Sequence, residues 1–296
     1  MAVTSQAHRK IVFGAMTFGQ KEVDTARVYG GGSSEAFLAE LDWKSRGIAL
    51  ATKLPPVGVY LPPFMDTRNK TLRDLMRESM SALKTDKVDL LYLHGPDRNR
   101  PYEQTLREIN DLYNEGCFTR FGISNFAAWE VAQISMWNQG IYNALHRAVE
   151  PELFPALRHY DIAFYAYNPL AGGLLTDRYQ RETKDHDGGR FDPNHAQGDL
   201  YRKKYWNDAR FDALDKIRPL AKSSGLTTAQ AALRWINHHS QLATESGDAI
   251  ITSASTAEQL EENLTAFEMG PLSDELLKAF DESYLVVKAD VSAYFF

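Results

Sequence analysis

The sequence contains a single cysteine, Cys117, in 296 residues. One cysteine cannot form an internal disulfide, so a disulfide-stabilised secreted fold is excluded and a reducing, cytoplasmic location is predicted. The opening stretch MAVTSQAHRK is polar, and we therefore expect no signal peptide. No apolar run approaches the roughly 18–20 residues that a membrane-spanning helix needs, so no membrane partner is expected.

An excess of positive charge is also absent. The net charge is -6, with acidic and basic residues mixed along the chain, which argues against a nucleic-acid partner. Metal-ligand spacing is absent as well, because the adjacent His238 and His239 would face different directions on a helix. We therefore expect no metal. Hydrophobic residues make up 44% of the chain, enough for a sizeable folded core.

Short apolar runs alternate with segments of helical periodicity, which indicates parallel strands joined by helical crossovers. Strands are predicted at residues 11–16, 48–53, 88–94, 119–125, 162–170 and 249–255, with a further short strand at Val23 and Asp24. Helices are predicted at residues 34–44, 71–84, 102–116, 127–137, 152–160, 210–225, 227–239, 256–268 and 273–284.

The missing GxGxxG motif decides between two folds of this class. An open doubly wound sheet that binds a dinucleotide would carry that motif after its first strand. Here the polar residues instead gather at the C-terminal ends of several strands, as in a (β/α)8 TIM barrel, and the length fits its usual size of about 250 residues. We predict a single α/β barrel domain over residues 1–296, with residues 179–207 forming a long lid loop.

Two junctions look shorter than a regular barrel requires. Too few residues separate the first strand from Val23 for a crossover helix, since parallel strands need roughly a dozen linking residues. The stretch ISMWNQGIYN runs from a helix into Gln139 without room for a normal strand. We therefore expect a shortened first crossover and a shortened sixth strand region.

Four chemically active side chains end three consecutive predicted strands: Asp24, Tyr29, Lys53 and His94. An ammonium group near a phenol favours the phenolate, so Lys53 would make Tyr29 a better proton donor. Asp24 would keep Lys53 charged, and His94 could hydrogen-bond a substrate oxygen. Each residue alone also has a structural explanation, as a turn residue, a surface aromatic, a solvated lysine or a core histidine. Their shared position at strand ends favours a catalytic group.

Several longer stretches resemble the aldo-keto reductases, especially the aflatoxin aldehyde reductase-like subgroup. These stretches are DTARVYGGGSSE, ATK, VDLLYLHGPD, GISNF, YNPLAGGLL and SASTAEQLEENL, and they occur in family order over nearly the whole chain. The resemblance implies an NADPH-dependent aldehyde reductase in which Tyr29 donates the proton, Lys53 lowers its pKa, Asp24 pairs with the lysine, and His94 orients the carbonyl.

The same resemblance implies an NADPH site and a substrate site. The cofactor residues would be Ser124, Asn125 and Gln139 at the nicotinamide; Asn168, Pro169, Leu170, Gly172 and Arg178 at the pyrophosphate; Ser253, Ser255, Gln259 and Asn263 at the adenosine; and Arg190 from the lid. Substrate contacts would come from His94, Tyr201 and Lys204. Lys204 stands where the subgroup commonly has arginine, so it lacks the two-pronged fork that suits a carboxylate.

The expected substrate is a small aldehyde or ketone, and we consider a homodimer as the assembly. Two other functions stay open at this point. Lys53 could act as the nucleophile of a Schiff-base lyase, which needs a depressed lysine pKa. Alternatively, the chain could bind cofactor as a catalytically impaired sensor.

Overall fold

A computed structural model describes residues 10–14, 22–61, 65–134, 137–183, 189–194 and 196–295. Parallel strands close into a barrel surrounded by helices, which confirms the predicted fold class. The strands follow one another around the barrel as β1 (Lys10–Gly14), β10 (Ala249–Thr252), β9 (Phe164–Tyr167), β8 (Trp137–Ile141), β7 (Phe118–Ser124), β6 (Val88–Leu93), β3 (Ala49–Leu54) and β2 (Glu22–Asp24). A small antiparallel pair, β4 (Tyr60–Leu61) and β5 (Met65–Asp66), follows β3.

The first crossover is short, as predicted. β1 pairs directly with β2 in parallel, with Phe13 opposite Val23. Residues 15–21 alone separate the two strands, which is too few for a crossover helix.

The expectation of a shortened sixth strand is wrong. Helix α4 (Ala128–Ile134) ends three residues before the predicted end at Trp137, and β8 then holds five residues. β8 pairs in parallel with β7, placing Gln139 opposite Ser124. Pairing with a neighbouring strand outweighed the helical spacing of the apolar residues in this segment.

The chain divides into two compact units. Unit 1 comprises residues 1–10, 141–155 and 166–294, and unit 2 comprises residues 11–140, 156–165 and 295–296. The prediction of one domain over the whole chain stays a prediction. No helix within the described ranges has the length and hydropathy of a membrane-crossing segment.

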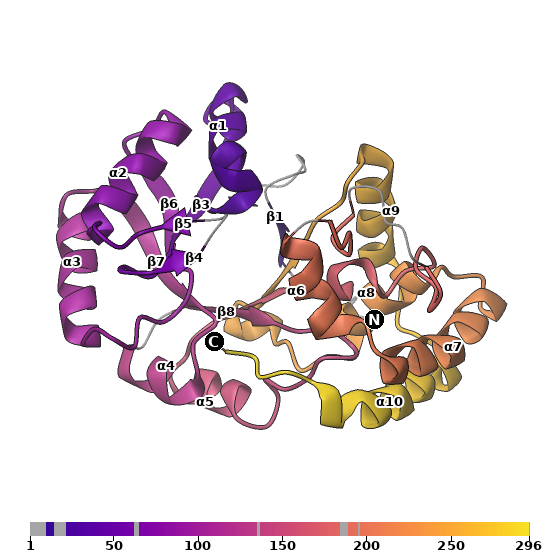
Figure 1. The fold of residues 1–296 in the computed structure, drawn as a ribbon. Coiled ribbons are helices and arrows are strands. Elements are labelled where there is room, and N and C mark those ends of the chain that lie inside the picture. The colour runs from indigo at the N-terminus through magenta and orange to yellow at the C-terminus, as the bar shows by residue number, and fades with distance from the viewer. Residues whose placement is uncertain are drawn as a thin grey trace, which may run out of the picture. The chain divides into compact units, whose positions relative to one another are not determined.

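In unit 2, the helices α1 (Ser33–Glu40), α2 (Leu72–Leu83) and α3 (Tyr102–Asn114) lie in succession beside strands β3, β6 and β7 (Figure 1). α2 buries one apolar face through Leu75 and Met76. Its N-terminus is fixed by a capping box, in which Thr71 and Asp74 each accept a bond from the other's backbone N–H. Helices α2 and α3 thus pack against strands β3 and β7.

In unit 1, α7 (Asp208–Ser223) packs along α10 (Asp274–Val287), and α8 (Thr228–His238) packs against α9 (Ala257–Glu268) (Figure 1). Each of these helices begins at a polar side chain that accepts a backbone N–H three residues on, as Thr256 does from Gln259 at the start of α9. Helix α5 (Leu153–His159) follows β8 in the chain and includes residues of both units.

The predicted lid loop is partly helical. α6 (Ala196–Tyr205) occupies its second half. Phe191 is fully buried, and its ring lies 5.0 Å from that of Tyr179 and 5.4 Å from that of Trp206, centroid to centroid. The aromatic residues of this segment therefore form a packed core, which a sequence rich in Gly, Asp and His did not indicate.

Candidate active site

A buried ion pair joins the ends of β2 and β3. Lys53 Nζ donates to Asp24 Oδ2 at 2.5 Å and to the backbone oxygen of Thr25 at 3.0 Å. Both charged side chains are almost completely enclosed, at 1% and 5% exposure. Parallel strands bring their C-terminal ends to one edge, which explains why residues far apart in sequence meet here.

The phenol of Tyr29 lies next to this pair. Lys53 Nζ is 3.3 Å from the Tyr29 hydroxyl and 4.9 Å from the centre of its ring. Tyr29 begins a short 3₁₀ turn over Tyr29–Gly32, where Gly30, Gly31 and Gly32 all have positive φ. Glycine adopts that conformation without strain, so the three glycines allow the chain to turn sharply and present the phenol. At 36% exposure, Tyr29 can reach solvent while the ion pair below it cannot.

His94 follows β6 and lies edge-on to Tyr29. The two ring centres are 5.7 Å apart at an interplanar angle of 81°. The backbone of His94 is fixed on both sides: its N–H donates to the Leu54 oxygen at 2.8 Å, and its own oxygen accepts from Asn125 Nδ2 at 2.8 Å. The structure thus brings all four predicted catalytic residues together within unit 2.

The charges of this group are set by burial and by mutual attraction. Burial lowers the pKa of Lys53, but attraction to Asp24 and Tyr29 outweighs it, and the pKa is raised above 10.5. Burial raises the pKa of Asp24, against the opposing effect of Lys53. Burial, and then the positive charge of Lys53, lower the pKa of His94 to about 3. The imidazole is therefore neutral near pH 7, while Lys53 is an ammonium.

Ser124, Asn125 and Gln139 form a second buried group at the ends of β7 and β8. Asn125 Nδ2 donates to Ser124 Oγ at 3.0 Å, and the Asn125 backbone N–H donates to the Gln139 oxygen at 3.1 Å. Asn125 has a φ of 66°, a conformation that asparagine tolerates better than most residues. A hydrogen bond from Gln139 lowers the pKa of Asp24, so this group adjoins the ion pair.

Unit 1 carries a separate polar cluster, which we call the Arg190 cluster. It consists of Asn168, Arg190, Tyr201 and Ser253. Arg190 donates to Asn168 Oδ1 at 3.4 Å, to the Tyr201 hydroxyl at 3.3 Å and to Ser253 Oγ at 3.2 Å. These residues come from the end of β9, the lid segment, α6 and the end of β10. The arginine is exposed, so its charge is available to a ligand.

Among the other predicted cofactor residues of unit 1, Asn263 contacts this cluster, and Ser255 and Gln259 bond to each other just after Ser253 in the chain. Asn263 Nδ2 donates to the Ser253 oxygen at 3.3 Å, and the Ser255 N–H donates to Gln259 Oε1 at 3.0 Å. Gly172 has a φ of +73°, and a Cβ there would lie 2.4 Å from Tyr201 Cε1.

Pro169 and Leu170 lead from Asn168 into the turn that holds Gly172. Arg178 instead lies over the ring of Tyr179, 5.3 Å from its centre. The predicted substrate residue Lys204 lies 5.9 Å from the ring of Tyr205 and is not part of the Arg190 cluster.

Sequence reasoning missed a buried carboxylate that supports the Tyr29 turn. Glu35 is fully enclosed and accepts from Thr52 Oγ1 at 2.7 Å, and its Oε2 lies 3.5 Å from Arg27 Nη1. Arg27 also donates to the Gly32 oxygen at 3.1 Å. Glu35 therefore links the residue before Lys53 to the turn that follows Arg27. Its place in a Ser-Ser-Glu helix start gave no signal beyond ordinary helix capping.

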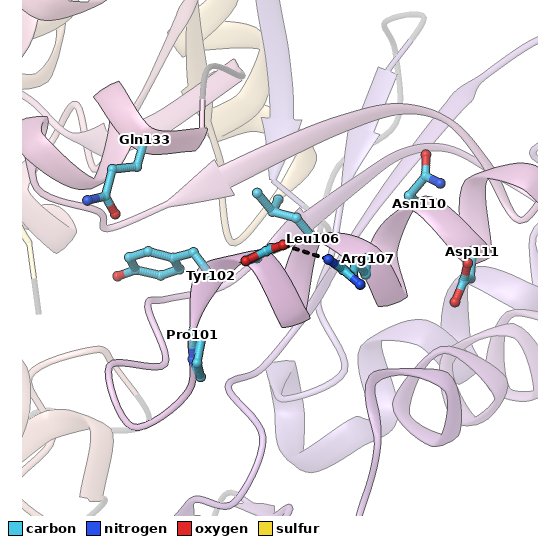
Figure 2. Close-up of a pocket in the computed structure, with 8 residues that line it drawn as sticks. Pro101, Tyr102, Leu106, Arg107, Asn110, Asp111 and Gln133 are labelled. Carbon is cyan, nitrogen blue, oxygen red and sulfur yellow. Dashed lines mark hydrogen bonds and ion pairs between the residues drawn. The ribbon is translucent and has the colours of Figure 1, made fainter.

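A surface hollow beside α3 is separate from these groups (Figure 2). Its lining comes from Pro101 to Asp111 and from Gln133 of α4, with an ion pair between Arg107 and Glu103 at 2.6 Å. None of the strand-end residues contributes to this lining. We therefore assign the chemistry to the strand ends.

Comparisons with known proteins identify the family to which the chain is similar. The model of the aldo/keto reductase family matches residues 2–285. An aldo-keto reductase of Pseudocercospora fijiensis is 52% identical over 289 residues, covering 94% of this chain and 97% of the relative. Aflatoxin B1 aldehyde reductase member 2 of Mus musculus is 41% identical over 299 residues, covering 94% of this chain and 80% of the relative.

Among solved structures, the fold resembles an aldo-keto reductase from Klebsiella pneumoniae determined in complex with NADPH. The TM-score is 0.63 at 23% identity, covering 90% of this chain and 80% of the other. At that identity the likeness supports the barrel fold alone.

Proposed function

The chain belongs to the aldo-keto reductase family and is an oxidoreductase, and we propose that it reduces aldehydes or ketones to alcohols with NADPH, with Tyr29 as the proton donor. One observation carries this proposal: the Tyr29 hydroxyl lies 3.3 Å from the ammonium of Lys53, which is itself held by buried Asp24 at 2.5 Å. No other described strand end combines an acid, a cation and a carboxylate in this way.

The proposed proton transfer uses the four residues in distinct roles. Tyr29 gives its proton to the substrate oxygen, and the Lys53 ammonium stabilises the phenolate that remains. Asp24 keeps the ammonium charged and in place. His94, neutral because its pKa is about 3, can donate a hydrogen bond to the same oxygen without supplying a proton. Tyr29 then recovers a proton from solvent, which its partial exposure permits.

In unit 2, the polar groups at the ends of β7 and β8 suit the nicotinamide end of a dinucleotide in chemical type. We assign the nicotinamide amide to Ser124, Asn125 and Gln139, whose side chains offer amide and hydroxyl partners. Bound NADPH would supply the hydride that the carbonyl carbon accepts.

We assign the phosphates and the adenosine of the cofactor to residues of unit 1. We assign the phosphates to the arginine of the Arg190 cluster and to the backbone N–H groups of the turn around Gly172. Pro169, Leu170 and Arg178 complete that side, while Ser253, Ser255, Gln259 and Asn263 take the adenosine end.

The substrate class follows from family membership and from a relative's name. Small reactive aldehydes, including dicarbonyls and dialdehydes, are the proposed substrates, in keeping with the mouse relative named as an aflatoxin B1 aldehyde reductase. We assign substrate contacts to His94, Tyr201 and Lys204.

A Schiff-base lyase is disfavoured by the state of Lys53. Its pKa is raised, and its Nζ already donates to Asp24 and Thr25, whereas a nucleophilic amine must be free of its proton. The cofactor-binding sensor stays the second alternative. NADPH binding without turnover of any aldehyde would favour it.

The proposal is tested by the substitution Tyr29→Phe, which removes only the hydroxyl. We expect kcat for an aldehyde panel to fall by about 10²–10⁴-fold, the usual contribution of a positioned general acid. The NADPH dissociation constant, measured by fluorescence quenching, should be unchanged. Tyr113→Phe serves as a matched control, because Tyr113 is an exposed phenol on α3. Equal kcat values for the parent and Tyr29→Phe would reject Tyr29 as the acid.

A further inference from the structure

Arg210 is a buried arginine with two donor nitrogens that no described residue satisfies. It lies in the first turn of α7 and is 1% exposed. Its Nη2 makes one long bond, at 3.4 Å, to the backbone oxygen of Asp290. Its Nε and Nη1 are enclosed and have no hydrogen-bond partner among the described residues, none of which forms an ion pair with it. A guanidinium with two such donors is unusual, because buried charges are normally paired.

The side chains around Arg210 include an ammonium, a phenol and an imidazole, and Asp290 is near enough for its charge to raise the pKa of Arg210. The Arg210 guanidinium carbon lies 5.6 Å from the ring centre of Tyr205, and Lys204 Nζ lies 5.9 Å from the same ring. The Tyr205 hydroxyl and His146 Nδ1 are also enclosed, with no partner that meets hydrogen-bond geometry among the described residues. We call Arg210, Lys204, Tyr205 and His146 the Arg210 cluster; all belong to unit 1.

The protonation states support the same interpretation. Burial lowers the pKa of Arg210. Burial, and then the charge of Arg210, lower the pKa of Lys204 to about 8. Burial, and then the charges of Lys204 and Arg210, lower the pKa of His146 to about 3. Arg210 is thus destabilised in its charged form by burial, against the attractions of Tyr205 and Asp290, whereas Lys204 and His146 are destabilised by burial and by positive neighbours. An anion at this place would favour the charged form of all three.

Arg218, on the same helix, is a second arginine whose hydrogen bonds can be compared with those of Arg210. Arg218 donates to the oxygens of Thr176 and Tyr179 at 2.7 and 2.6 Å and to Gln180 Oε1 at 3.1 Å. Two of its three nitrogens are thus satisfied and Nε alone is not, whereas Arg210 makes one long bond and leaves both Nε and Nη1 unsatisfied among the described residues. The lack of hydrogen-bond acceptors is therefore a feature of Arg210 and not of α7 as a whole.

We propose that the Arg210 cluster binds a small oxyanion, with the guanidinium fork as its main contact. A planar guanidinium matches two oxygens of a carboxylate, phosphate or sulfate, and the Tyr205 hydroxyl could donate to a third. The oxyanion has two sources that share this chemistry: a free inorganic anion, or a carboxylate carried by the carbonyl substrate. Anion binding as such goes beyond the proposed reductase activity, and only the assignment of the oxyanion to the substrate rests on that activity.

The first test measures anion binding without turnover. The melting temperature of the purified protein is recorded in 1–10 mM phosphate or sulfate and in sodium chloride of equal ionic strength. We expect oxyanions to raise it by about 3 °C, since a ligand bound only by the folded state stabilises that state. Arg210→Met should lose this rise, and Arg218→Met should keep it. No rise in the parent protein, or an equal rise in Arg210→Met, would overturn the proposal.

The parent measurement stands even if Arg210→Met fails to fold, and Lys204→Met provides a second variant with a reduced rise. Arg210→Met itself is expected to melt higher than the parent in the absence of oxyanions, because it removes an unpaired buried charge.

The second test separates the two sources. KM is measured for 4-carboxybenzaldehyde and for benzaldehyde, which lacks the carboxylate. If the oxyanion is the substrate's own carboxylate, Arg210→Met should raise KM at least about tenfold for the first aldehyde alone, and phosphate should compete with it. If the site takes free anions, the KM ratio should be unchanged while phosphate stabilisation is lost in the variant. Absence of both effects would reject the site.

Discussion

The ammonium of Lys53 lies 3.3 Å from the Tyr29 hydroxyl and 2.5 Å from a carboxylate oxygen of Asp24. The cation therefore serves two partners of different kinds, a buried carboxyl group and a partly exposed phenol. Such a cation can stabilise a phenolate as it forms without losing its own proton, because Asp24 holds the pKa of Lys53 above its usual value against burial.

Removing the cation tests the buried pair. Lys53→Met leaves Asp24 enclosed without its partner, and breaking a buried pair in this way typically costs about 3–5 kcal/mol. We expect that loss in the free energy of unfolding, measured by urea denaturation at pH 7, and expect Asp24→Asn combined with Lys53→Met to recover part of it. Arg68→Ala breaks the exposed pair with Asp66 and should cost far less, because solvent screens an exposed ion pair. A Lys53→Met loss no larger than that would contradict the account.

The neutral state of His94 predicts a pH dependence of stability. Its pKa is about 3 in the folded chain and 6.5 ordinarily, so between these values the unfolded chain holds a proton that the folded chain lacks. The free energy of unfolding should therefore rise with pH from about 3 to about 6.5 and fall on acidification through that window. His146, with a pKa also near 3, contributes with the same sign.

His94→Gln should reduce this slope in urea titrations between pH 4.5 and 7, leaving the share of His146. Substitution of the exposed His159 by Gln is the matched control and should leave the slope unchanged. A slope in His94→Gln as steep as in the parent would show that the imidazole is protonated in the folded protein.

The sequence was sufficient for the barrel and for the meeting of Asp24, Tyr29, Lys53 and His94. Strand–helix alternation implies parallel strands, and parallel strands carry their end residues to one edge, so those positions follow from order alone. β8 was misjudged, because apolar spacing in ISMW fits a helix until pairing with β7 is known.

Features that depend on helix faces could not be predicted. Glu35 and Arg210 look like ordinary charged helix residues, and only packing shows that both are enclosed. The helical second half of the lid segment was missed for a similar reason, since its stability comes from aromatic packing around Phe191.

The Arg190 cluster predicts a loss of cofactor affinity without loss of fold. Arg190→Ala should weaken NADPH binding by about 10–100-fold, because hydrogen bonds to charged groups contribute about 1.5–3 kcal/mol. The dissociation constant is measured by fluorescence quenching, with kcat at saturating NADPH expected to change little. Arg181→Ala is the matched control, since Arg181 is bound by Asp208, Asp212 and Asp215 of α7. Unchanged affinity in Arg190→Ala would remove this arginine from the cofactor site.

The turn after β9 lies so close to α6 that position 172 has no room for a side chain. A Cβ there would lie 2.4 Å from Tyr201 Cε1, and the φ of +73° is itself strained for alanine. Gly225 provides a control with a φ of +70° and open space around it. Gly225→Ala should therefore cost only backbone strain, about 1 kcal/mol, whereas Gly172→Ala should cost more and displace Tyr201 from Arg190. Urea denaturation measures the first effect, and a weaker NADPH affinity confined to Gly172→Ala measures the second. Equal stability losses with unchanged affinity would mean that Tyr201 moves aside freely and does not hold Arg190 in place.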